Sequence, residues 1–489
     1  MTARQLRHSC LGIALAAIVF PAAPAAADTY LVVYRGADVP AKAASTVQQA
    51  GGKLVASYGR IGVAVARSNS SSFDERMEQD ARVAGAESTA GFGVSLRDAG
   101  TEDGGADGAG ILATWGDPLS GLQWDMRQIN VAQAHAIEAG DPTVVVADID
   151  TGLNFTHPDI APNYDASRSA DCSSGAPQPL TADSDDSIGH GTHTAGTIAA
   201  AANGRGIVGT APGVRIAGIK SSNDDGFFFP EMVVCSFMWA AAKGIDVTNN
   251  SYFADPWLFN CRNDAEQRAI WNAERRAIRY AQSHGVLVVA SEGNQSTDLS
   301  HPERDVISPD FPPGSEVERE ITNACSVVPV EVPGVVGVTA TGNLRLKSFY
   351  SSYGISTADL AAPGGDSILQ VTPEAPNGRV LSTFPAATPC TRVVFDAGAK
   401  YCYLQGTSMA APHVTGVAAL ILSAPGRDLS PGALAAKVQQ ATNPLACPSD
   451  MSIYAPFPQS NGEPQSCQGG ATHNSFYGHG EVDALKAVE

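Results

Sequence analysis

Five short apolar runs, separated by long helical stretches, dominate the chain between residues 143 and 339. The runs are continuously apolar rather than alternating, and they cover residues 143–147, 214–219, 245–248, 286–290 and 335–339. Strands of a parallel sheet read this way because helices cover both of its faces. Helical stretches at 231–243 and 264–283 lie between the runs. We therefore expect an α/β domain of three layers, in which a mainly parallel central sheet lies between helices.

Two shorter blocks precede this large domain, which we assign to residues 117–489. Residues 28–98 begin with the order strand, helix, strand, strand, helix, strand, which is typical of a small α+β (ferredoxin-like) unit. Its helices are expected near residues 40–50 and 71–81. Residues 99–116 are rich in Gly and Asp at their start, and they indicate an exposed linker that a protease would cut easily.

The first 27 residues have the pattern of a secretory signal peptide. Arg4 and Arg7 precede an apolar run at 11–20, and small residues at 25–27 form a cleavage site. No later stretch reaches the roughly 18 uninterrupted apolar residues that a membrane helix needs. We therefore expect a secreted, extracellular protein without a membrane anchor.

The charge balance excludes two classes of partner. With 31 Lys and Arg against 50 Asp and Glu, the formal net charge of the 489 residues is −19. Nucleic-acid binding requires clustered basic residues that displace phosphate counterions, and anionic membrane surfaces attract basic segments for a similar reason. We expect neither nucleic acid nor membrane as a partner.

The cysteines favour disulfide bonds. Of the nine, Cys10 leaves with the signal peptide, and the other eight all lie beyond residue 170. An even set in an exported protein favours pairing, although eight cysteines allow 105 connectivities. The first pairs to test are the nearest in sequence, Cys390 with Cys402 and Cys447 with Cys467. For any one cysteine, a buried free thiol is the alternative.

Four polar residues stand at the ends of expected elements. Asp150 follows the apolar run at 143–147, and Asn294 follows the run at 286–290. His190 and Ser408 each begin a helix of small apolar residues. In open α/β sheets, functional side chains meet at the carboxyl ends of the strands.

These four residue types suit acyl transfer. A serine hydroxyl needs an imidazole to take its proton, and the imidazole needs a carboxylate to fix its tautomer. An oxyanion that develops on the substrate needs donors, which an asparagine side chain and a helix N-terminal N–H supply. Each role has one candidate in this sequence.

The motifs around these residues resemble the signatures of the subtilase (subtilisin-like) serine peptidases. They are DIDTG at Asp150, HGTHTAGTIAA from His190, VVASEGN ending at Asn294 and GTSMAAPHVTG at Ser408. The resemblance implies that Asp150 orients, that His190 is the general acid and base, and that Ser408 is the nucleophile. Asn294 and the N–H of Ser408 become the oxyanion donors. The block at 28–98 is similar to the family's propeptide, which is a folding chaperone and temporary inhibitor.

The same resemblance implies a substrate-binding strand and allows a metal ion. Ser251, Tyr252 and Phe253 replace the family's Ser-Leu-Gly, so Phe253 is expected to narrow the entrance for the residue before the scissile bond. Asp159 and Asn203 align with calcium ligands of many subtilases. No cofactor is required, and calcium is the only metal that the resemblance suggests.

Three other residues carry expectations of their own. His193 is interpreted as a packed structural histidine rather than one half of a metal pair with His190. Pro412 is expected in the first turn of its helix, where a missing N–H does no harm. The acidic stretch 183–186 is interpreted as a solvated loop, with a preference for basic substrates as the alternative.

Together these features indicate a secreted serine endopeptidase, made as a self-processing zymogen and acting on polypeptides as a monomer. Its own propeptide is the expected intramolecular partner. The alternative from another class is a catalytically silent scaffold of the same fold that binds peptides. An esterase or lipase is disfavoured because no G-x-S-x-G motif surrounds Ser408.

Overall fold

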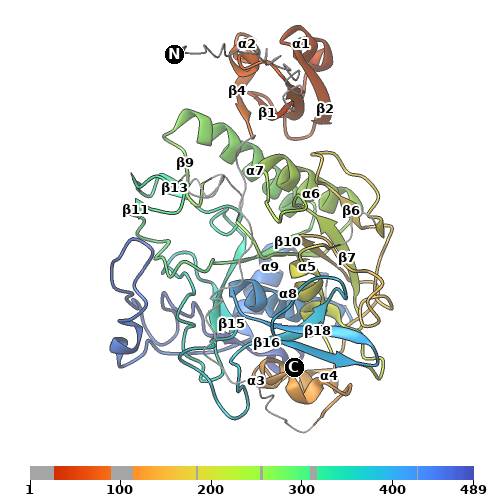
Figure 1. Cartoon of the computed structure of the whole chain (residues 1–489), viewed down its shortest axis with the longest axis vertical. Helices are drawn as coiled ribbons and strands as arrows, with labels where there is room; N and C mark the ends of the chain where they lie inside the picture. The colour runs from red at the N-terminus through yellow and green to blue at the C-terminus, as the bar shows by residue number, and fades with distance from the viewer. Residues whose placement is uncertain (1–26, 90–113, 183–185, 254–256, 309–315, 427) are drawn as a thin grey trace, which may run out of the picture.

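The computed structural model describes residues 27–89, 114–182, 186–253, 257–308, 316–426 and 428–489. The expected signal peptide and most of the expected linker lie outside these residues. Figure 1 shows a small N-terminal domain at one end of a larger domain, with the long helices α6 (Pro230–Lys243) and α7 (Ala265–Ser283) beneath it. Within the described residues, no helix combines the length and apolar character needed to cross a bilayer.

A nine-stranded sheet forms the centre of the large domain. Every adjacent pair of strands is parallel except the pair at one edge, β19 with β20. Five of its strands, β14, β10, β8, β5 and β7, coincide with the five predicted apolar runs. In spatial order the strands are β19 (Thr442–Asn443), β20 (Glu481–Val482), β15 (Leu360–Pro363), β14 (Val336–Thr341), β10 (Leu287–Ser291), β8 (Val247–Asn250), β5 (Val145–Asp150), β7 (Arg215–Lys220) and β6 (Ala170–Asp171).

Helices cover both faces of this sheet, so the predicted three-layer α/β architecture is confirmed. Ala147 and Ile149 of β5 point into the core under α6 and α7, whereas Val146 points into the core on the opposite face. On that opposite face lie α3 (Trp124–Gln128), α4 (Val131–His135), α5 (His190–Ala199), α8 (Thr407–Ser423), α9 (Pro431–Gln440) and α10 (Ala484–Val488). Short 3₁₀ turns occur at Ser120–Leu122 and Met451–Tyr454.

The small domain has the predicted order of strands and helices. Its antiparallel sheet has the order β2-β3-β1-β4. Leu31 and Val33 of β1 pack toward α6 and α7, while Tyr30 and Val32 pack against the domain's own helices, as the period of a strand requires. The elements are β1 (Asp28–Tyr34), α1 (Ala43–Gln49), β2 (Gly52–Tyr58), β3 (Val63–Ser68), α2 (Phe73–Glu78) and β4 (Val83–Ser88).

Three small sheets complete the large domain. An antiparallel sheet of β16 (Val380–Phe384), β18 (Ala399–Leu404) and β17 (Val393–Asp396) lies against α5, where the Ser382 hydroxyl donates to the carbonyl of His193 at 2.7 Å. Two-stranded pairs join β11 (Arg304–Asp305) to β12 (Arg319–Glu320) and β9 (Asn260–Cys261) to β13 (Cys325–Ser326).

All eight cysteines beyond residue 170 are paired. Cys390–Cys402 and Cys447–Cys467 confirm the two pairs nearest in sequence. The other two bonds join distant segments, Cys172 with Cys235 and Cys261 with Cys325.

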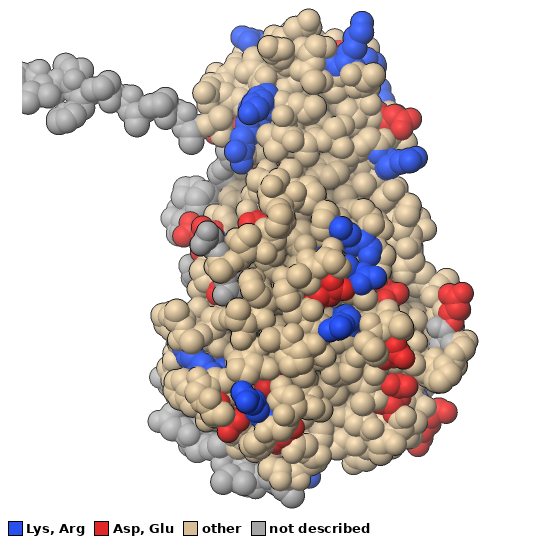
Figure 2. Space-filling view, turned by 90° about the vertical axis from the view of Figure 1, so that its right-hand side faces the viewer, with Lys and Arg blue, Asp and Glu red and all other residues tan. Residues whose placement is uncertain are grey.

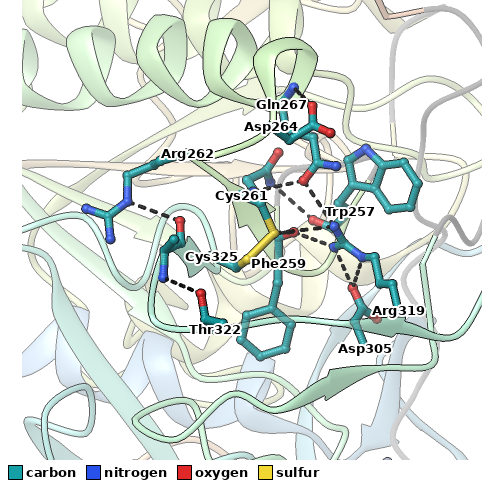
Figure 3. Close-up of a disulfide and its surroundings, with 12 residues drawn as sticks. Trp257, Phe259, Cys261, Arg262, Asp264, Gln267, Asp305, Arg319, Thr322 and Cys325 are labelled. Carbon is teal, nitrogen blue, oxygen red and sulfur yellow. Dashed lines mark hydrogen bonds and ion pairs between the residues drawn. A yellow bond between two sulfur atoms is a disulfide. The ribbon is translucent and has the colours of Figure 1, made fainter.

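Figure 3 shows the Cys261–Cys325 bond together with an arginine that holds the same segment. The Arg319 guanidinium donates to the carbonyl of Phe259 at 2.5 Å and to the Asp305 carboxylate at 2.7 Å. The same guanidinium lies 4.4 Å from the centre of the Trp257 ring. This bond and this arginine therefore hold residues 257–261, which lie near the expected substrate strand in sequence.

Candidate active site

Asp150 and His190 form a close pair at the carboxyl end of β5. The last residue of β5 is Asp150, which is fully buried, and its Oδ1 lies 2.7 Å from Nδ1 of His190, the first residue of α5. The backbone N–H of Thr151 also donates to Asp150 Oδ1 at 2.7 Å. Gly191 permits this approach, because a Cβ there would lie 2.2 Å from the carbonyl of Gly152. Asp150 thus holds Nδ1 of His190 and orients its ring.

Asp186 anchors the start of α5, a role that the sequence interpretation missed. Its carboxylate accepts from the N–H groups of Gly189 at 2.7 Å and Thr192 at 2.8 Å, and from the Thr151 hydroxyl at 2.8 Å. The Thr192 hydroxyl and the Ile188 N–H donate to it as well. Asp186 is buried, so the expectation of a solvated loop is wrong at this residue. One signal for this role was available in the sequence: an acidic residue four positions before the histidine that begins the helix.

Replacing Asp186 with alanine should lower the free energy of unfolding by about 3 kcal/mol, since several buried donors lose their acceptor. Urea unfolding of the two variants in an inactive background measures this change. The exposed Asp225→Ala is the matched control and should change stability by less than about 0.5 kcal/mol. Equal stabilities of the two variants would contradict the anchoring role.

Ser408 is the second residue of α8, and α8 packs against α5. His190 and Ser408 therefore stand at the starts of two neighbouring helices on one face of the sheet. The Ser408 hydroxyl donates to the carbonyl of Ser251 at 3.2 Å, and the Ser251 hydroxyl donates to the carbonyl of Ser408 at 3.0 Å. This reciprocal pair places the segment after β8 directly beside Ser408.

Pro412 corrects one expectation and explains that pair. It lies inside α8, in the second turn rather than the first. Its missing N–H leaves the carbonyl four residues earlier, that of Ser408, without a helical donor. The Ser251 hydroxyl supplies the donor instead. The proline therefore frees the carbonyl that ties Ser408 to the neighbouring strand.

Asn294 is oriented by Thr407. Its Oδ1 accepts from the backbone N–H and from the hydroxyl of Thr407, both at 2.9 Å, so its amide end faces the other way. A Cβ placed on Gly406 would lie 3.4 Å from Asn294 Nδ2 and 3.6 Å from the N–H nitrogen of Ser408. The two nitrogen donors thus border the same space, next to Gly406.

The three residues of the expected substrate strand differ in exposure. Ser251 and Tyr252 are buried, and the Tyr252 ring stacks on Phe228 with centroids 4.4 Å apart. Phe253 is half-buried against the core beneath α6 and α7. Of the three, Phe253 alone presents a partly exposed large side chain.

A sequence model of the subtilase family matches residues 141–480, which is most of the chain. The chain belongs to the subtilase family. Fervidolysin of Fervidobacterium pennivorans is 33% identical over 335 residues, a match that covers 63% of this subtilase but only 38% of fervidolysin. Subtilisin BL of Lederbergia lenta is 31% identical over 301 residues, which are 61% of this chain and 84% of that relative.

Solved structures share the fold. The crystal structure of fervidolysin aligns with a TM-score of 0.65 at 23% identity, covering 94% of this chain and 61% of that one. A serine protease of Staphylococcus aureus that processes the epidermin leader peptide aligns with a TM-score of 0.68 at 21% identity, covering 94% and 99%. Both alignments extend over nearly all of this subtilase.

The two residues aligned with calcium ligands do come together, but they do not form a suitable cage. Both oxygens of Asp159 face donors: the Tyr401 hydroxyl at 2.9 Å, the Ile207 N–H at 3.1 Å and the amide nitrogen of Asn203 at 3.3 Å. Burial raises the pKa of Asp159 to about 6. Calcium requires several oxygen ligands, and the described residues contain no group of three or more His, Cys, Asp or Glu that would hold a metal ion. These residues therefore do not fit the ion.

His193 is structural, as predicted. It is completely buried, and its Nε2 lies 3.0 Å from the carbonyl of Cys402 on β18. Burial lowers the pKa of His193 to about 3, so the ring is neutral and donates to this carbonyl.

Proposed function

We propose that this subtilase is a secreted serine endopeptidase that hydrolyses peptide bonds through an acyl-enzyme. The observation that carries the proposal is the 2.7 Å bond from Asp150 to His190, on the helix that packs against the one carrying Ser408. The oriented amide of Asn294 supports it, because acyl transfer needs donors where the oxyanion forms.

In this mechanism the Ser408 hydroxyl attacks the substrate carbonyl while His190 Nε2 takes the hydroxyl proton. Asp150 keeps the remaining proton on Nδ1 and stabilises the imidazolium that results. Asn294 Nδ2 and the N–H of Ser408 donate to the oxyanion, and a single such donor typically contributes about 10²–10³-fold in rate. His190 then protonates the leaving amine, and water releases the acyl group by the reverse steps.

We further propose that residues 1–27 are a signal peptide, that 28–98 form an inhibitory propeptide and that 99–116 hold the maturation site. Residues 117–489 are then the catalytic domain. The contacts across the boundary support this division: Arg276 of α7 donates to the carbonyls of Tyr34 at 2.8 Å and Ile61 at 3.1 Å, and the Tyr58 hydroxyl donates to the carbonyl of Gly175 at 2.6 Å. Such a docked domain is suited to the role of chaperone and temporary inhibitor.

Intact mass with and without a serine-directed phosphonyl probe tests the proposal. Wild type should lose the N-terminal domain and take up one probe molecule, whereas Ser408→Ala should do neither. Loss of the domain without probe uptake would indicate processing by another peptidase. Retention of the domain and no probe uptake would instead favour the silent peptide-binding scaffold.

Docking of the N-terminal domain should weaken as pH rises. Burial raises the pKa of Glu231, at the start of α6, from 4.5 to about 7, with Thr89 and Arg67 acting in the opposite direction. Burial, together with Glu266, Glu78, Asp74 and Asp264, raises the pKa of Glu87 to about 8. A carboxyl whose pKa is higher in the docked state than in the free state stabilises docking fully when the pH is below its free-state pKa. This contribution is lost as the pH rises toward its docked-state pKa. For Glu231 the contribution is lost as the pH rises toward about 7.

The expected loss of affinity is at most roughly tenfold per pH unit for each such group. Size-exclusion chromatography of the processed mixture at about pH 5 and about pH 8 measures the fraction that stays docked. Glu231→Gln should flatten the profile, and Glu75→Gln, an exposed glutamate on α2, should not. A pH-independent complex would contradict this prediction.

Phe253 should restrict the residue before the scissile bond. We expect Phe253→Gly to raise kcat/KM for large side chains at that position by about tenfold relative to small ones, since the ring occupies space beside Ser251. Profiling with a peptide library measures the ratio. Phe395→Gly, which removes a 62% exposed phenylalanine on β17, is the control. An unchanged profile in Phe253→Gly would refute the role.

A further inference from the structure

A groove of about 360 Å³ lies between the N-terminal domain and α7, and it contains four arginines. The small domain contributes Arg35 and Arg60, and α7 contributes Arg276 and Arg279. None of the described residues that line the groove is acidic. In a chain with a net charge of −19, such a gathering of uncompensated positive charge is unexpected.

Contacts of the backbone across the domain boundary keep the four arginines near one another. Arg276, at the base, donates to the carbonyls of Tyr34 and Ile61 across the domain boundary. Gly62 lets the turn between β2 and β3 pack against the loop after β1, because a Cβ there would lie 2.2 Å from the carbonyl of Gly36. Arg60 and Arg35, which flank these two contacts in sequence, are therefore kept on one rim of the groove.

Among the described residues, no carboxylate pairs with these arginines. Arg35 donates to the carbonyl of Ala81 at 3.0 Å and Arg279 to that of Pro333 at 3.1 Å, which leaves other guanidinium N–H groups of each for a ligand. Burial, and after it the neighbouring Arg275, lower the pKa of Arg276. On the face that Figure 2 shows, basic side chains also gather toward the upper end, which carries the small domain.

Local donors occupy one of the carbonyl groups near the end of α7. The carbonyl of Tyr280 accepts from the ring of His284 at 2.8 Å and from the Ser283 hydroxyl at 2.7 Å. The Ser283 hydroxyl also lies beside the groove as a neutral polar group.

We propose that this groove binds a phosphate- or sulfate-type oxyanion that bridges the two domains. Guanidinium groups recognise such anions through paired, charge-assisted hydrogen bonds. Because each domain supplies two of the arginines, the anion binds the docked state only and must stabilise it. This inference rests on the proposed function, in which the docked N-terminal domain inhibits the peptidase. A bound anion then prolongs the lifetime of the inhibited zymogen.

Calorimetric titration of inorganic pyrophosphate into full-length Ser408→Ala, in a chloride buffer free of oxyanions, tests the site. We expect saturable one-to-one binding, and sulfate in place of pyrophosphate distinguishes the two types of anion. Arg60→Gln in the small domain and Arg279→Gln in α7 should each weaken binding by about tenfold or more. The control is Arg215→Gln, because Arg215 also donates to a backbone carbonyl, that of Pro162 at 3.0 Å, and lies on β7 away from the groove.

Absence of saturable binding of either anion up to about 10 mM, or equal binding by all three arginine variants, would overturn the proposal. Binding lost in Arg279→Gln alone would overturn the bridge between the domains. None of these outcomes depends on proteolysis, because the titrated protein lacks the Ser408 hydroxyl. The mass measurement on wild type tests the proposed peptidase separately.

Discussion

Replacing Ser408 with alanine should lower kcat for peptide hydrolysis by on the order of 10⁶-fold, the scale of loss known for dismantled triads. In the proposed mechanism the Ser408 hydroxyl forms the acyl bond, and alanine removes it. This hydroxyl donates one hydrogen bond of 3.2 Å to the carbonyl of Ser251, so the fold should persist without it. Some catalysis above the uncatalysed rate should remain, because the oxyanion donors are still present.

Kinetics with a chromogenic peptide and purified protein measure this loss. Ser423→Ala is the matched control, because Ser423 is a buried serine on the same helix whose hydroxyl donates to the carbonyl of Ala419 at 2.8 Å. It should retain activity within about twofold. If Ser408→Ala kept more than about 10⁻³ of the wild-type rate, hydrolysis would have to occur at another site.

Replacing Asp150 with asparagine should lower kcat by about 10⁴-fold with little change in KM. Asparagine has nearly the shape of aspartate, so the buried site stays packed. Asp150 Oδ1 accepts the Thr151 N–H, so the side-chain oxygen of the asparagine should occupy that position. The neutral amide cannot stabilise the imidazolium of His190 as the carboxylate does. The loss of kcat therefore measures the effect of the Asp150 charge and of the His190 tautomer rather than a change in packing.

Asp148 provides a control on the same strand. It is buried, and its carboxyl lies 2.7 Å from the Thr194 hydroxyl and 2.9 Å from the amide of Asn249. Burial, with Asp150 nearby, raises the pKa of Asp148 well above its usual value. Its two carboxyl oxygens bond Thr194 and Asn249, so the substitution leaves the bond between Asp150 and His190 in place. Asp148→Asn should change kcat by less than about tenfold. Equal losses in the two variants would contradict the special role of Asp150.

The sequence predicted the parts of this fold that local patterns determine. Continuous apolar runs identified the five central strands, and the order of elements in residues 28–87 identified the small domain. Asp150, His190, Asn294 and Ser408 were found because each stands at the end of an element, where residue type and position can be interpreted together.

What escaped prediction depends on contacts between distant segments. The strand β15, between β20 and β14, and the sheet of β16, β17 and β18 are recognisable only when they pair. Val380–Phe384 is buried throughout and does not alternate. Asp186 looked like part of a charged loop until α5 and Thr151 supplied its donors. Pro412 was assigned to the wrong turn: it is the sixth residue of α8, which begins at Thr407. Cys172 and Cys235 are 63 residues apart, too far for spacing to suggest a bond.

The distribution of the disulfides has a consequence for how the molecule comes apart. Every one of the four bonds closes within residues 172–467, and residues 28–98 contain no cysteine. A single cut in the main chain between the two domains therefore leaves them joined only by reversible contacts. The larger part then keeps all of its cross-links, while the smaller part is free to diffuse away, unfold and be degraded. In the proposed zymogen, such a cut makes maturation irreversible without any need for a reductant.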